Sequence, residues 1–159
     1  MFSIEVDISK QLLTVFSRQQ IEREYLVSTA KNGAGEENGS EKTPRGQHII
    51  RAKIGAECQE NTVFIRRRST GEIYTPMLRN QFPGRDWILT RILWLSGLEV
   101  GKNRLGSVDT MRRYIYIHGT PDDVPMGAPG SRGCIRMRNS EIIDLFNLIP
   151  VGTPITLKE

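Results

Sequence analysis

The sequence predicts a mainly β fold with one main helix near residues 140–149. Short segments in which apolar and polar residues alternate recur along the chain, as they do in strands buried on one face. Segments rich in Gly, Asn and Pro separate them, as turns do. The 159 residues contain no repeat and no linker, so we expect a single domain that spans 1–159.

The first thirty residues are typical of a β-meander. FSIEVDI (2–8) alternates apolar and polar residues, QLLTVFS (11–17) follows after a short turn, and QIEREYLVSTA (20–30) alternates again. The next segment, KNGAGEENGSEKTPRG (31–46), consists largely of turn-forming residues. It predicts a long loop, and loops of such length in compact domains are often functional or mobile.

Four further strand candidates follow this loop: QHIIRAKIG (47–55), TVFIRRR (62–68), EIYTPML (72–78) and DWILTRILWLSG (86–97). We expect a turn at 69–71 between the second and the third. Pro76 argues against a central position for the third strand, because proline cannot donate to a sheet ladder. The fourth is strongly apolar, which favours a buried strand or strand pair.

The last third of the chain holds two polar loops around one strand. A Gly-bearing loop at 97–113 precedes RYIYIHG (113–119), the clearest strand in the sequence, and a loop rich in Pro and Gly (121–133) follows it. PITLKE (154–159) is expected to be a closing strand.

The segment SEIIDLFNLI (140–149) has the apolar spacing of a helix. Asn139 or Ser140 is a suitable N-cap, and acidic residues near the start suit the helix dipole. Pro150 and Gly152 are expected to end the helix.

Composition and charge name no partner by themselves. The chain has 22 basic and 18 acidic residues, a net charge of +4 that favours anionic partners. We interpret the basic run Arg66, Arg67 and Arg68 as an exposed strand end rather than a nucleic-acid patch, so no nucleic-acid partner is expected. No apolar stretch approaches the ~20 residues that span a bilayer.

The chain contains two cysteines, Cys58 and Cys134, and two histidines, His48 and His118. These four side chains are a conceivable zinc ligand set, but no two of them share a short metal-binding spacing. We therefore predict no metal site and no cofactor. Cys58 lies outside any motif and is interpreted as a structural residue.

Cys134 and His118 are the candidates for nucleophilic chemistry. A cysteine attacks as thiolate, and its ordinary pKa of about 8.5 leaves little thiolate at neutral pH unless a base takes the proton. The fifteen residues between the two form a loop that can bring the strand-end imidazole beside the thiol. A backbone carbonyl such as that of Gly119 is the candidate for holding the imidazole in one tautomer, since no acidic residue is obviously placed for it.

Gly133, directly before the cysteine, is a second feature that is consistent with catalysis. Without a side chain, it lets the backbone N–H groups of Arg132, Gly133 and Cys134 face a substrate carbonyl as an oxyanion hole. The alternative is a half-buried structural thiol, since free cysteines are commonly buried. A histidine and a cysteine at this spacing do not decide between these two interpretations.

A sequence motif favours the catalytic interpretation of Cys134 over the structural one. IHGT (117–120), then a loop with GAPGS (127–131), then GCIRM (133–137) resembles the signature of the L,D-transpeptidase catalytic domain, the YkuD-like family. The opening meander, TPRGQHII (43–50) and the closing VGTPITL (151–157) are also similar to that family, so the resemblance covers residues 2–158. It implies the family's β-sandwich or barrel-like fold.

One departure from the family pattern stands next to the nucleophile. The family most often has His before Gly-Cys, whereas this chain has Arg132. The family's base is the earlier histidine, which matches His118, so the implied reaction is unaffected. A permanently charged guanidinium at this position can favour the thiolate or receive a substrate carboxylate.

The resemblance implies a cysteine acyltransferase that acts on peptidoglycan stem peptides through a Cys134 thioester, with His118 as general base and acid. Arg136 matches the family's arginine and is expected to bind a substrate carboxylate or to brace the loop, and Ser131 and Thr120 are expected to line the pocket. The resemblance also implies acylation of Cys134 by carbapenems.

The sequence leaves two alternatives to this prediction and disfavours a third. Resolution of the thioester by water would make an L,D-carboxypeptidase of the same site, and a non-catalytic basic module that binds the cell wall is the other class. Papain-like enzymes are disfavoured because they place Cys before His, whereas here His118 comes first.

The implied substrate sets an expectation for localisation. Peptidoglycan lies in the cell envelope, so we expect the protein there or in the periplasm, although no signal peptide is visible before the first predicted strand and a cytoplasmic location stays open. The sequence gives no indication of the oligomeric state.

Overall fold

The structure, a computed structural model, describes all residues 1–159 and is mainly β. The strands are β1 (Phe2–Asp7), β2 (Leu12–Ser17), β3 (Gln20–Leu26), β4 (Gly46–Ile54), β5 (Thr62–Ile65), β6 (Arg68–Ile73), β7 (Ile88–Gly97), β8 (Tyr116–Gly119), β9 (Ile135–Met137) and β10 (Pro154–Lys158). The helices are α1 (Pro76–Gln81), α2 (Asn139–Leu148) and a short 3₁₀ turn (Gly106–Val108). The predicted fold class, mainly β with one main helix, is confirmed.

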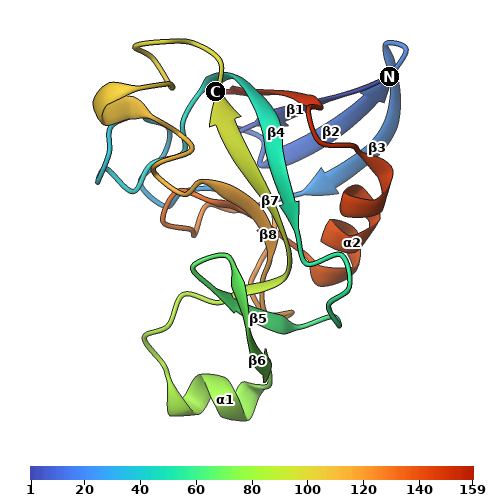
Figure 1. The fold of residues 1–159 in the computed structure, drawn as a ribbon, viewed down its shortest axis with the longest axis vertical. Coiled ribbons are helices and arrows are strands. Elements are labelled where there is room, and N and C mark those ends of the chain that lie inside the picture. The colour runs from blue at the N-terminus through green and yellow to red at the C-terminus, as the bar shows by residue number, and fades with distance from the viewer.

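All ten strands belong to one sheet, in the order β3-β2-β1-β10-β4-β7-β5-β6, with β8 and β9 branching from β7. The predicted N-terminal meander is present as the antiparallel β1–β2–β3. The predicted closing strand, β10, lies between β1 and β4, parallel to the first and antiparallel to the second. The C-terminal strand therefore joins the meander to the rest of the sheet, as Figure 1 shows.

One apolar core holds the sheet and α2 together. Twenty buried side chains contribute to it, among them Leu13, Ile50 and Leu93 from the sheet and Ile142 and Leu145 from the helix. The helix packs against β7 and β8. Because α2 covers the strand that carries His118, its packing fixes that strand's position. None of the helices is long and apolar enough to cross a membrane.

The helix begins one residue before the predicted start. Its N-cap position is Arg138, which makes no side-chain capping hydrogen bond, and Asn139 is instead buried inside the first turn. Ile149 is the C-cap, directly before Pro150, as the proline predicts.

The β5–β6 hairpin turns at Arg66 and Arg67 rather than at the predicted 69–71. Both residues have left-handed backbone, with φ of 50° and 63°. A two-residue hairpin turn requires this conformation, and Asn-Gly is its usual signature. Because two arginines occupy these positions instead, the sequence predicted the turn at 69–71, around the next glycine.

The predicted strand 72–78 is wrong over its second half, where α1 forms. Pro76 is the first helical residue, a position in which its missing N–H costs nothing. The Thr75 hydroxyl oxygen accepts the Leu78 N–H at 3.1 Å and caps the helix. Thr-Pro is therefore a helix start here. Figure 1 shows α1 and the β5–β6 hairpin together at the end of the molecule opposite the β1–β3 meander.

Candidate active site

Strands β8 and β9 place their side chains alternately toward the core and toward a pocket. They pair in parallel, with Ile117 opposite Ile135 and His118 opposite Arg136. Ile117 and Ile135 are completely buried in the main core. Because successive residues of a strand point to opposite faces, His118 and Arg136 share the other face with Cys134, the residue before β9.

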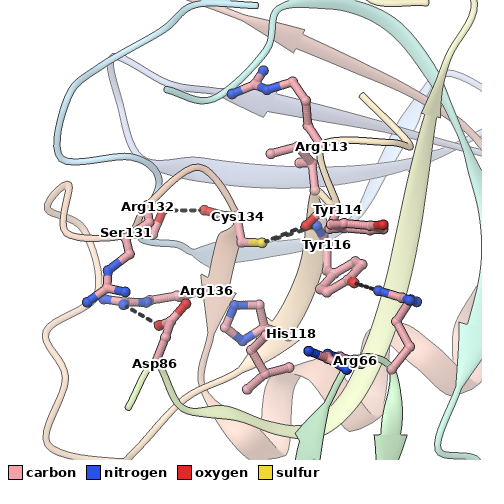
Figure 2. A pocket seen from close by; sticks show the side chains of 13 residues that line it. Arg66, Asp86, Arg113, Tyr114, Tyr116, His118, Ser131, Arg132, Cys134 and Arg136 are labelled. Atoms are coloured by element: carbon pink, nitrogen blue, oxygen red, sulfur yellow. Dashed lines mark hydrogen bonds and ion pairs between the residues drawn. The ribbon is translucent and has the colours of Figure 1, made fainter. Parts of the chain in front are cut away.

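That face forms the wall of a pocket of about 380 Å³. Of the predicted site residues, Cys134, His118, Ser131, Arg132 and Arg136 line it, and Figure 2 shows the His118 ring and the Cys134 sulfur facing the same hollow. The loop 121–133 thus returns the cysteine to the strand that ends in the histidine.

The Cys134 thiol is half-buried at the base of this pocket. The sulfur accepts the Tyr116 N–H at 3.3 Å, and the thiol donates to the Tyr114 carbonyl at 3.4 Å. Burial raises the pKa of the thiol to about 12, against smaller opposing effects of the Tyr116 N–H and the positive charges of Arg136 and Arg113. At neutral pH the resting cysteine is therefore a neutral thiol.

His118 is buried, with 1% of its surface exposed. Its Nδ1–H donates to the Gly119 carbonyl at 2.6 Å, because a carbonyl oxygen can only accept. Nε2 is then the unprotonated nitrogen, and no group of the protein is hydrogen-bonded to it. Burial lowers the pKa of the imidazole, with the nearby Asp86 charge opposing the shift. The ring is a neutral base with a free lone pair, and in this structure no hydrogen bond joins it to the Cys134 sulfur.

A buried polar network fixes the end of β8, where Gly119 lies. A Cβ on Gly119 would collide with Asn139 Oδ1 and lie 2.6 Å from the Leu89 carbonyl oxygen, so only glycine fits. Asn139 accepts the Thr90 hydroxyl at 2.6 Å and donates to the Thr120 carbonyl at 3.0 Å. Thr90 lies in a bulge of β7 with a left-handed φ of 76°, a strained conformation for a β-branched residue.

This network packs against Gly119 and binds the Thr120 carbonyl, and so fixes the segment whose Gly119 carbonyl orients His118. Thr90 and Asn139 were not among the predicted site residues, because the sequence placed one in a strand interior and the other at a helix cap. Thr120 itself is buried and lines a neighbouring hollow rather than the pocket of Cys134.

The backbone around Cys134 leaves two N–H groups without partners. The Gly133 N–H donates to the Ser131 hydroxyl oxygen at 3.1 Å, and that hydroxyl donates to the Cys134 carbonyl at 2.5 Å. The N–H groups of Arg132 and Cys134 make no hydrogen bond within the protein. Gly133 has a left-handed φ of 132°, which favours glycine. Ser131 therefore shapes the loop, and two amides stay available to a ligand.

Arg136 and Asp86 form an ion pair in the pocket wall, with Nη2 and Oδ1 3.2 Å apart. Arg136 also donates to the Gly130 carbonyl at 3.0 Å, which braces the cysteine loop. Asp86 is the only acidic residue that lines the pocket. Asp86 was not among the predicted site residues, because it belongs to a turn-like segment far from the motif in sequence.

Two arginines at the pocket mouth come from the β5–β6 turn. Arg67 stacks on the rings of Trp94 and Tyr114, with its guanidinium carbon 4.9 and 4.5 Å from their centroids, and donates to the Tyr116 hydroxyl at 2.9 Å. Arg66 has no hydrogen-bond or ion-pair partner and lines the pocket. The basic run that was expected to be an exposed strand end therefore borders the candidate site.

The four side chains considered as zinc ligands do not form a cluster. No group of three or more His, Cys, Asp or Glu side chains is arranged to hold a metal ion. His48 lies on β4 with both ring nitrogens hydrogen-bonded, and Cys58 is a free thiol outside the pocket.

The sequence from residue 2 to residue 157 matches the model of the YkuD family, described as the L,D-transpeptidase catalytic domain. The chain belongs to this family. A similar relative is the putative L,D-transpeptidase YkuD of Bacillus subtilis, 39% identical over 46 residues, which are 29% of this chain and 28% of the relative. The chain therefore aligns with less than a third of that relative's length.

Solved L,D-transpeptidases share the fold. An enzyme from Mycobacterium smegmatis superimposes with a TM-score of 0.59 at 19% identity, covering 99% of this chain and 58% of that one. The L,D-transpeptidase LdtMt1, solved in complex with imipenem, has a TM-score of 0.58 at 18% identity and the same coverage. This chain spans a little under three fifths of the length of either structure.

Proposed function

We propose that this protein is a cysteine acyltransferase that acts on peptidoglycan stem peptides, with Cys134 as nucleophile and His118 as general base and acid. The single observation that carries the proposal is the shared pocket, in which the Cys134 thiol and the His118 ring with a free Nε2 lie on one face of β8–β9. Family membership supports the same activity.

The first step forms the thioester. The thiol and the imidazole are both neutral at rest, so the proton moves from sulfur to Nε2 as the sulfur attacks the carbonyl of the penultimate diamino acid. The sulfur must leave the Tyr114 carbonyl to do so, and we propose that it does this by rotation of the Cys134 side chain. His118 then gives the proton to the departing terminal D-residue.

The oxyanion of this step needs donors on the cysteine loop. The free N–H groups of Arg132 and Cys134 serve this role, each typically worth ~3 kcal/mol of barrier. The Gly133 N–H is used by Ser131, so Ser131 contributes by holding the loop rather than by touching substrate. Thr120 acts in the same way, through its carbonyl and Asn139.

The charge of the pocket suits an anionic peptide. Arg66 and Arg132 line it without partners, and Arg136 lies opposite the histidine with one bond to Asp86. Stem peptides carry free carboxylates, which guanidinium groups bind as paired hydrogen bonds. We assign Arg136 and Arg132 to carboxylate recognition, with no cofactor or metal in the reaction.

Acylation by a carbapenem tests the proposal. Imipenem incubated with the protein should add one drug mass to the intact chain, and Cys134→Ala should remove that adduct. Failure of the wild type to form an adduct, or an undiminished adduct on the alanine variant, would contradict the cysteine mechanism and favour a non-catalytic wall-binding module. The complex of LdtMt1 with imipenem motivates the choice of drug.

An L,D-carboxypeptidase on the same site is the second candidate. It shares every residue above and differs only in that water resolves the thioester. Product analysis of a synthetic stem tetrapeptide, with and without an added amine, separates a cross-linked product from a tripeptide. Since the substrate polymer lies outside the cytoplasmic membrane, we propose the cell envelope as the place of action, which fractionation of producing cells tests.

A further inference from the structure

The Asp86–Arg136 pair lies between two hollows of different charge. On one side is the 380 Å³ pocket of Cys134, and on the other a smaller hollow of about 180 Å³ that Asp86 and Arg136 also line. Figure 2 shows the pair at one side of the pocket, apart from Tyr114 and Arg113. A molecule in the smaller hollow therefore contacts the same ion pair that borders the pocket of Cys134.

The arginines of the two hollows differ in their partners. In the smaller hollow, Arg79 is paired with Asp123 at 2.7 Å and Arg85 with Glu72 at 2.9 Å. In the larger one, Arg66 and Arg132 have no carboxylate partner. The larger pocket is thus suited to carboxylates, whereas the smaller hollow is charge-balanced and does not repel a cation.

One carboxylate oxygen of Asp86 has no hydrogen-bond partner. Its Oδ1 makes the only hydrogen bond of the carboxylate, to Arg136, and Oδ2 has no partner. About a third of the side chain is exposed. A single monodentate contact leaves room for a second positively charged donor, which an ammonium group supplies.

We infer that Asp86 is the binding site for the acceptor amine, a primary aliphatic ammonium group that enters through the smaller hollow and resolves the Cys134 thioester. This inference rests on the proposed function and assigns a residue that its thioester step does not use. It predicts that Asp86 sets the choice between amine and water, and hence between cross-linking and trimming.

The chemistry balances with the residues present. The ammonium bound to Asp86 loses one proton to solvent and attacks the thioester carbonyl as a neutral amine. The new C–N bond forms, the second proton passes to His118 Nε2, and the C–S bond breaks. The imidazolium then returns that proton to the sulfur, so that Cys134 leaves as a thiol.

Partitioning between two products tests the inference. The donor is a synthetic tetrapeptide whose last two residues are a diamino acid and D-alanine, and the acceptor probe is Nα-acetyl-lysine amide. Asp86→Asn keeps an oxygen for Arg136 but removes the charge, and we expect it to lower the ratio of amide to hydrolysed product about tenfold at subsaturating amine. Asp86→Glu should restore most of the ratio.

Asp144→Asn is the matched control, because Asp144 also pairs with an arginine, Arg23, at 3.2 Å and lies outside both hollows. Its ratio should equal that of the wild type. An Asp86→Asn ratio equal to the wild type overturns the inference, as does a loss confined to the rate of Cys134 acylation by imipenem, which would mean that Asp86 only positions Arg136.

Failure of the inference is distinguishable from failure of the proposed function. If imipenem acylates Cys134 and the tetrapeptide is only hydrolysed at every amine concentration, the acceptor site is refuted and the cysteine mechanism stands. If no adduct forms on Cys134, the proposed function fails before Asp86 is tested.

Discussion

The two histidines of this chain lie in equally buried surroundings and differ in one hydrogen bond. His48 on β4 is fully buried, with Nδ1 bonded to the Gly46 carbonyl and Nε2 to the Thr110 hydroxyl, both at 2.9 Å. His118 on β8 has the same kind of carbonyl bond at Nδ1 but no partner at Nε2, and it borders a pocket. Burial alone therefore does not mark a functional histidine. What distinguishes His118 as the candidate is a free ring nitrogen in a pocket that it shares with the Cys134 thiol.

Removal of the free Nε2 of His118 should produce the largest effect, a loss in the rate of Cys134 acylation. His118→Asn keeps an amide donor for the Gly119 carbonyl but has no base near Cys134, so acylation by imipenem should slow about a thousandfold. Stopped-flow or time-resolved mass measurements give the rate. Urea unfolding of the same variant serves as the control for folding, and an acylation rate within tenfold of the wild type would mean that His118 is not the base.

Acid should destabilise the fold in part through His48. Burial lowers its pKa from 6.5 to about 4, so the unfolded chain takes up a proton between these values while the folded chain does not. The free energy of unfolding should therefore fall by about 3 kcal/mol as the pH drops from 7 to 4, at 1.36 kcal/mol per pKa unit. Urea titrations across this range measure it.

The variant His48→Leu separates this effect from the other titrating groups. It removes the proton uptake, so its unfolding free energy should depend less on pH than that of the wild type over 4–6.5, with imipenem acylation retained. A pH dependence equal to that of the wild type would assign the acid sensitivity to other residues, His118 among them, whose pKa burial also lowers.

The two cysteines offer a second comparison between a residue inside the pocket and one outside it, and here the expected change in stability is the smallest. Cys58 is half-buried against the Phe64 and Ile92 cluster and lies outside the pocket of Cys134. Cys58→Ser should change the unfolding free energy by less than about 1 kcal/mol and leave one imipenem adduct per chain. An adduct on Cys58 in the wild type, located by peptide mapping, would show that reactivity does not depend on the pocket.

Local patterns carried most of the fold prediction. Alternation identified the meander and β8, and helical spacing placed α2 within one residue of its start. The errors fell where side-chain identity hides backbone conformation. Two arginines occupy the left-handed turn of β5–β6, and Thr75 with Pro76 begins a helix inside a predicted strand.

The residues of the candidate site likewise fall into those that the sequence predicted and those that it did not. His118 and Cys134 belong to a motif that spans 21 residues of sequence (117–137), so their pairing was predictable from the chain alone. Asp86, Thr90 and Arg66 come from other strands and turns and carry no local signal. Nothing near them in sequence indicates that β7 and the β5–β6 hairpin lie beside the pocket.

The sequence by itself determined most of the strands, the main helix, and the family motif with the candidate pair His118 and Cys134, because each depends on residues close together along the chain. Only the tertiary structure decided which nitrogen of which histidine is free, which amides of the cysteine loop lack partners, and which carboxylate lines the pocket of Cys134. These depend on contacts between residues that are distant in sequence, such as Thr90 with Asn139 and Asp86 with Arg136. The packing of α2 against the sheet brings these residues together, and no local conformational preference does so.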